Sequence, residues 1–260
     1  MSATWYCCRQ RAGPLIKECR ALRPRFSADD TAADHGQKAQ LKKYARCAIN
    51  RKQCDRLELH LALLGERGTM YTLTFDAEHL PQNFNGVRQA LRSFFARVRR
   101  WRASMSKPPG IDYIYAIEGL HGQRRYHIHL ILNDDELCPA EVDLLWRNGI
   151  VDNQPVLRRS WYIDPDTGER CWCYRDGYRR IAEYLNKERT DGHVIPIGRH
   201  PWSCSRTLSA KLDPPERWKD DSGVIEIPDN VLWSRRGEVS NDFGAYYYAS
   251  WIEPITRATN

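Results

Sequence analysis

The sequence lacks several features that define other classes of protein. No stretch approaches the roughly 18 apolar residues of a membrane helix, and the first residues lack the apolar core of a signal peptide. We therefore expect a cytoplasmic protein without a membrane partner. The pattern GxxxxGK[ST] is also absent, which excludes a helicase module of the P-loop type.

The cysteines show no regular spacing. There are nine, an odd number, and no Cys-x-x-Cys pair occurs among the five nearest the N-terminus, which are Cys7, Cys8, Cys19, Cys47 and Cys54. A disulfide framework or a structural zinc site needs more regular spacing than this. We expect reduced thiols.

Composition indicates a folded protein with a modest positive charge. Hydrophobic residues make up 42% of the 260 residues, which is enough for a packed core, and the net charge is +7. The positive excess is compatible with a nucleic-acid partner without requiring one. We divide the chain into a basic, cysteine-containing extension (1–67), a core (68–210) and a C-terminal extension packed on that core (211–260).

The core alternates strand and helix patterns. The β-branched and aromatic runs 69–75, 111–119 and 124–133 predict strands, and apolar residues at steps of three and four predict a helix over 85–105. Further helices are expected over 139–148 and 177–189, with a hairpin between them around the turn 164–168. This order predicts an α+β fold in which helices pack on one face of a central antiparallel sheet.

Two histidines stand two residues apart in the third strand. His127 and His129 therefore project from the same face, where two imidazoles can chelate a divalent metal. Glu118 ends the preceding strand, and a hairpin between the two strands would bring its carboxylate beside the pair. The alternative is two polar residues on a solvated strand and a carboxylate in a surface salt bridge.

The last predicted helix of the core carries a candidate nucleophile. Tyr184 and Lys187 are three residues apart and share a helix face. A phenol can attack phosphorus, and an ammonium can neutralise the charge that builds there. The alternative is a half-buried tyrosine beside a solvated lysine. Tyr178, about 120° away round the same helix, is the rival nucleophile.

Three motifs in order resemble those of HUH rolling-circle replication initiators. They are the strand Tyr71 to Phe75, the pair His127 and His129, and Tyr184 with Lys187. Glu118 stands where these families place a third metal ligand. Residues 198–208 and 241–248 are similar to the tail of the phage-type family related to filamentous-phage gene II protein. The resemblance covers roughly residues 68–250.

The resemblance implies an RRM/ferredoxin-like HUH endonuclease core that nicks one strand of origin DNA, single-stranded or supercoiled. It further implies a 5′-phosphotyrosyl intermediate, a free 3′-hydroxyl that primes replication, and Mg²⁺ or Mn²⁺ as cofactor. The partners would be a host helicase and polymerase in the cytoplasm of a bacterial host cell. Arg180, four residues before Tyr184, replaces the first tyrosine of two-tyrosine relatives, so one nucleophile is expected.

The stretch from His79 to Ile111 contains no acidic residue. Uncompensated positive charge of this kind suits contact with DNA phosphates, although a solvated cationic face is the alternative. The residues that we expect to bind DNA lie on the 85–105 helix and beside the histidine strand; they are Arg88, Arg92, Arg99, Arg102, Arg124 and Arg125.

Two other functions fit parts of the pattern. One is another HUH enzyme, such as a single-strand transposase or a relaxase, although relaxases place their tyrosine upstream of the histidines. The other is a non-catalytic protein that binds single strands by stacking on Trp161, Tyr162, Trp172 and Tyr174. Metal-dependent nicking separates the enzymes from the binding protein.

Overall fold

The chain divides into two compact units, which are described separately. The central unit comprises Leu63–Arg158 and Arg180–Lys211, and the flanking unit comprises Met1–Ala62, Arg159–Arg179 and Leu212–Asn260. The structure is a computed structural model that describes residues 4–22, 51–65, 67–120, 125–133, 135–156, 160–163, 167–168, 170–173, 178–187, 202–241 and 244–254, and of 160–163 and 170–173 only the backbone.

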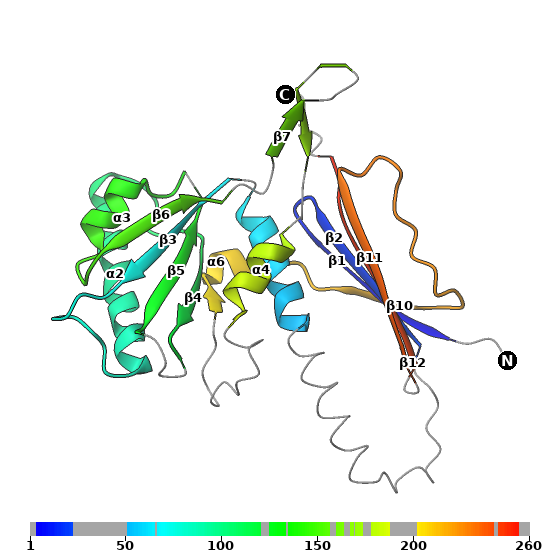
Figure 1. Ribbon diagram of the computed structural model, residues 1–260, viewed down its shortest axis with the longest axis horizontal. Coiled ribbons are helices and arrows are strands. Elements are labelled where there is room, and N and C mark those ends of the chain that lie inside the picture. Colours follow the sequence, from blue (N-terminus) through cyan, green and yellow to red (C-terminus); the bar gives the residue numbers. More distant parts are fainter. Residues whose placement is uncertain are drawn as a thin grey trace, which may run out of the picture. The chain divides into compact units, whose positions relative to one another are not determined.

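A five-stranded antiparallel sheet forms the middle of the central unit (Figure 1). Its order is β6-β3-β5-β4-β9, and the strands are β3 (Thr69–Thr74), β4 (Tyr113–Glu118), β5 (His127–Leu132), β6 (Val151–Pro155) and β9 (Trp202–Cys204). The three strands predicted from sequence are confirmed as β3, β4 and β5. The α+β fold with an antiparallel sheet is confirmed as well.

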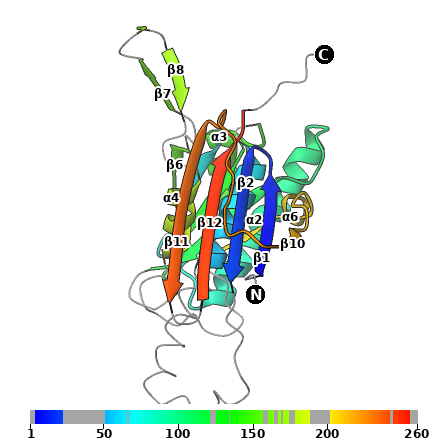
Figure 2. The ribbon, with the colours of Figure 1, turned by 90° about the vertical axis from the view of Figure 1, so that its right-hand side faces the viewer.

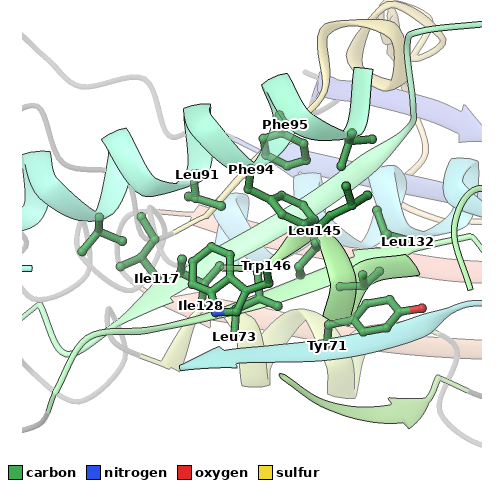
Figure 3. Packing of buried hydrophobic residues seen from close by; sticks show 14 of the residues in the cluster. Tyr71, Leu73, Leu91, Phe94, Phe95, Ile117, Ile128, Leu132, Leu145 and Trp146 are labelled. Atoms are coloured by element: carbon green, nitrogen blue, oxygen red, sulfur yellow. The ribbon is translucent and has the colours of Figure 1, made fainter. Parts of the chain in front are cut away.

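Helix α2 (Phe84–Ser104) covers the apolar face of this sheet. It begins at Asn83, whose side chain accepts a hydrogen bond from the Gly86 amide, and it buries a stripe that includes Val87, Leu91 and Phe94. Figure 3 shows Leu91 and Phe94 packed against alternate residues of β3 and β5 and against Trp146 and Leu145 of α3 (Pro139–Leu145). Burial of this stripe, not helix propensity alone, fixes α2 on the sheet.

The expected packing of helices on one face of the sheet holds for α2 and α3 but not for α4. Successive residues of β5 point to opposite faces, so Ile128 and Leu130 face α2 while His127 and His129 face away. Helix α4 (Arg179–Leu185) carries Tyr184, whose hydroxyl contacts His129, and it therefore lies on the face opposite to α2 (Figure 1). The short α6 (Arg206–Ala210) follows β9.

The flanking unit contains a second five-stranded antiparallel sheet, seen face-on in Figure 2. Its order is β10-β1-β2-β12-β11, and its strands are β1 (Trp5–Ala12), β2 (Leu15–Leu22), β10 (Glu216–Asp220), β11 (Trp233–Asn241) and β12 (Gly244–Ile252). The sequence analysis assigned these strands to an N-terminal extension (1–67) and a C-terminal extension (211–260). In the structure β2 pairs with β12, so strands from both segments build one sheet.

The structure also tests the hairpin that the sequence predicted around the turn 164–168. The hairpin is confirmed as β7 (Ser160–Ile163) paired with β8 (Arg170–Cys173), although the aromatic side chains proposed for stacking there lie outside the described side chains. Residues 51–64 are helical.

The described cysteines Cys7, Cys8, Cys19, Cys54, Cys138 and Cys204 are free thiols. Among the described residues, no helix is long and apolar enough to span a membrane.

Candidate active site

Three neighbouring strands place polar side chains on the sheet face opposite α2. In the β4–β5 pairing Glu118 lies directly opposite His127, and in the β3–β5 pairing Thr72 lies opposite His129. Because residues two apart share a face, these four side chains gather around one end of β5. The hairpin that the sequence predicted between the Glu118 and histidine strands is present.

Glu118, His127 and His129 form a compact cluster. The carboxylate oxygens of Glu118 lie 2.9 Å from His127 Nε2 and 2.8 Å from His129 Nε2. Potential ligand atoms of all three residues lie within 4.8 Å of one another, so the group could hold a metal ion. Glu118 and His129 are only 3% and 4% exposed, which marks the cluster as part of the fold and not as a solvated strand face.

The Nδ1 atom of each imidazole also has a hydrogen-bonding partner. Thr72 Oγ1 lies 3.2 Å from His129 Nδ1, and the Arg125 carbonyl lies 3.3 Å from His127 Nδ1. When the Nδ1 atoms donate these bonds, the Nε2 lone pairs are free to ligate a cation. Thr72 was missed by the sequence analysis. The alternation of its strand put it on the polar face, but only the pairing with β5 reveals its partner.

Tyr184 and Lys187 reach the same cluster from α4 and the residues after it. The Tyr184 hydroxyl lies 3.2 Å from His129 Nε2, and Lys187 Nζ lies 2.6 Å from a Glu118 oxygen and 3.9 Å from the centre of the Tyr184 ring. Tyr184 is 40% exposed, whereas the rival Tyr178 is fully buried. A solvent-accessible phenol therefore stands beside the candidate metal ligands.

The cluster is strongly coupled electrostatically. Burial opposes ionisation of Glu118, but hydrogen bonds from His127, His129 and Lys187 outweigh it and hold the pKa of the carboxyl well below its usual range. The bond to Glu118 raises the pKa of His127, and despite partial burial the same carboxylate raises the pKa of Lys187. A cation bound to His127 would take the place of its proton, so metal binding here would release protons.

The predicted DNA-binding arginines fall into three groups. Arg88, Arg92, Arg99 and Arg125 are exposed. Arg102 is only 8% exposed: its guanidinium donates to the carbonyls of Pro108 and Glu136 and pairs with the Glu136 carboxylate at 2.9 Å. Arg102 therefore cannot serve as a phosphate contact, and this part of the prediction is wrong. Arg124 lies outside the described residues.

A comparison with known proteins bears on the same region. Residues 68–189 match the sequence model of a family of replication-associated proteins, named for ORF2 and the gene II protein. No curated protein and no solved structure matches the chain. Over the matched range, which includes every member of the cluster from Thr72 to Lys187, the chain is similar to replication-associated proteins.

Proposed function

We propose that this protein is a site-specific, metal-dependent endonuclease and strand transferase of the HUH type that initiates rolling-circle replication. One observation carries the proposal: the accessible hydroxyl of Tyr184 lies 3.2 Å from His129, which itself belongs to the Glu118, His127 and His129 cluster. A nucleophile beside a candidate metal site is the arrangement that tyrosine attack on a phosphodiester requires.

The donor set fits Mg²⁺ or Mn²⁺. Two imidazole nitrogens and one carboxylate leave coordination positions open for water and phosphate oxygens, and Mn²⁺ accepts imidazole more readily than Mg²⁺ does. Glu118, His127 and His129 would hold the ion. When bound, such an ion polarises a phosphate oxygen and stabilises the negative charge of the transition state.

The remaining chemistry belongs to side chains of this chain. Tyr184 Oη attacks the phosphorus, its proton passes to water at this exposed position, and the bond from phosphorus to the 3′ oxygen breaks. The 3′ oxygen takes up a proton and leaves as the hydroxyl that primes synthesis, while the 5′ phosphate stays on Tyr184. Lys187 keeps its charge because Glu118 raises its pKa, and it can neutralise charge developing on the phosphate.

The DNA strand would be held by the exposed arginines Arg88, Arg92, Arg99 and Arg125. Phosphate contacts of this kind give affinity and orientation without reading sequence. The proposed partners remain single-stranded or supercoiled origin DNA together with a host helicase and polymerase. A transposase of the same chemical class shares the tyrosine step, whereas a non-catalytic binding protein does not.

A labelled pool of random single-stranded oligonucleotides tests the proposal. After incubation with Mn²⁺, a pool labelled at its 3′ end should give labelled protein in a denaturing gel, because the 5′ phosphate of the 3′ fragment stays on the tyrosine. The same pool labelled at its 5′ end should release only free shortened DNA. Labelled protein should be missing with a chelator and with Tyr184→Phe. If no adduct forms with any metal ion, the alternative of a non-catalytic protein that binds single strands would be favoured.

A further inference from the structure

A small pocket lies on the α2 side of the central unit, away from the metal cluster. It has a volume of 160 Å³ and lies where α2, the segment before β4 and the start of α6 meet. Pockets for drug-sized ligands exceed about 300 Å³. The size therefore suits one planar ring and not a larger molecule.

Stacked aromatic rings form part of the pocket wall. The rings of Phe95 and Tyr113 are 4.0 Å apart at an interplanar angle of 18°, and Ile111 lies beside them. Phe95 is buried, which holds the partly exposed Tyr113 ring in place. A rigid aromatic surface of this kind favours stacking of a nucleobase, worth about 1–3 kcal/mol per base.

Two arginines line the same pocket from different elements. Arg99 comes from α2 and Arg206 from α6, and both are exposed. Neither lies within salt-bridge distance of a carboxylate in the described part of the chain. The nearby Asp112 is already held by Lys211 at 2.5 Å and by Thr207 at 2.5 Å. The pocket thus presents two positive charges without a compensating acid.

We propose that this pocket binds one nucleotide of single-stranded DNA, with the base against Tyr113 and the adjoining phosphates on Arg99 and Arg206. This inference rests on the proposed function, which makes single-stranded DNA the substrate. Tyr113 and Glu118 are the two ends of β4, about 17 Å apart at 3.3 Å per residue. A strand held in the pocket would be anchored at a fixed distance from the cleavage site.

Binding measured without divalent metal tests the phosphate contacts. The probe is a fluorescent random-sequence single-stranded oligonucleotide, followed by anisotropy over a range of salt concentrations. Arg99→Ala combined with Arg206→Ala should weaken binding about tenfold and reduce the salt slope by about 1.4, since each single-strand phosphate contributes about 0.7. Arg100→Ala, one position along the same helix and outside the pocket, should change the slope less. Equal effects of Arg99→Ala and Arg100→Ala would overturn the proposal.

Filling the pocket tests the base contact. Gly110 lines the pocket, and a Cβ atom there would meet no atom within 4 Å, so Gly110→Leu starts from open space and adds an apolar side chain at the pocket wall. Single-strand binding should weaken about fivefold or more, within the worth of one stacked base, while duplex binding stays unchanged because duplex bases remain paired. Unchanged single-strand binding by a variant with wild-type melting temperature would contradict the pocket. If these variants change single-strand binding as expected but the wild-type protein forms no DNA adduct, the nicking function is wrong and the pocket proposal stands.

Discussion

Each sheet contains one buried glutamate, and the side chains that pair with each one decide whether its carboxylate could help to bind a metal ion. Glu18 on β2 of the flanking unit is held by Arg9 at 2.6 Å and by Arg20 at 3.1 Å. Glu118 on β4 of the central unit is held by two histidines and a lysine. Arginine is permanently charged and offers no lone pair, whereas neutral histidine ligates metals.

The comparison separates a charge network of carboxylates and arginines from the cluster to which we assign the proposed metal site. In the flanking sheet, the charge of Arg20 is further matched by Asp220 at 2.5 Å, so carboxylates and guanidinium groups alternate. In the central sheet, one carboxylate faces three basic groups and a phenol. Only the second arrangement changes its charge state when protons leave the imidazoles, which is the behaviour that a metal site requires.

The largest contrast should come from removing each carboxylate in turn. Glu118→Gln should weaken Mn²⁺ binding about 100-fold or more, because a ligand loses its charge and removal of supporting groups alone costs 10–100-fold. Glu18→Gln should leave Mn²⁺ affinity unchanged and should cost roughly 1–3 kcal/mol of stability, because Arg9 and Arg20 each lose a charged partner while Arg20 keeps Asp220. Calorimetric Mn²⁺ titration and urea unfolding measure the two quantities. Equal Mn²⁺ affinity in both variants would contradict the assignment of Glu118, and not Glu18, as a metal ligand.

Lys187→Ala should slow adduct formation about 100-fold at saturating DNA. In the proposed mechanism the ammonium acts on charge that develops in the transition state, so binding of DNA should change much less than the rate. Single-turnover rates and anisotropy measured on the same protein check this. Lys219→Ala is a matched control, since Lys219 is exposed on β10 and lies over the Tyr6 ring, not at the cluster. A fall in affinity without a fall in rate would give Lys187 a binding role only.

Thr72→Val should weaken Mn²⁺ binding about tenfold, within the range for lost second partners of ligating histidines. Valine keeps the β-branched shape, so packing is preserved while the contact of Oγ1 with His129 Nδ1 is lost. Thr72→Ser should restore the affinity, because the hydroxyl returns. A weak-binding serine variant would show that the shape at this position matters and not the hydroxyl.

Asp112 is a carboxylate of the central unit that, like Glu18, pairs with groups outside the metal cluster. Burial raises the pKa of Asp112, but hydrogen bonds from Lys211, Thr207 and Ser205 lower it more. Its stabilisation is therefore full above the usual aspartate pKa near 4 and is lost as the pH falls through the lower folded value. Asp112→Asn should cost at most about 1 kcal/mol at pH 7, since Lys211 is largely exposed, and should leave Mn²⁺ affinity unchanged. The unfolding free energies of the two proteins should differ at pH 7, and the difference should shrink as the pH falls below about 4.

Local patterns predicted most of the central unit. Strand alternation and a short loop were enough to place Glu118 beside His127, because a hairpin fixes its own register. The burial of Arg102 also had a signal that was not used: it lies four residues after Val98 and so continues the apolar stripe of α2. Met105, the last residue of the predicted helix, is by contrast 54% exposed.

Pairings between distant segments could not be predicted. The sheet of the flanking unit joins β2 to β12 across more than 200 residues, and no local pattern encodes such a contact. The contact of Thr72 with His129 and the position of α4 opposite α2 likewise depend on tertiary packing. The sequence predicted which side chains would lie together more fully than it predicted the elements that support them.

The most direct measurement is to map the residue that carries DNA after reaction with Mn²⁺. The adduct would be trapped on the wild-type protein, digested, and sequenced by mass spectrometry. The account predicts a single modified residue among the thirteen tyrosines, Tyr184, and no adduct with Tyr184→Phe, whose fold should be unchanged at this exposed position. A DNA adduct on any other residue, or an adduct that persists with Tyr184→Phe, would contradict it.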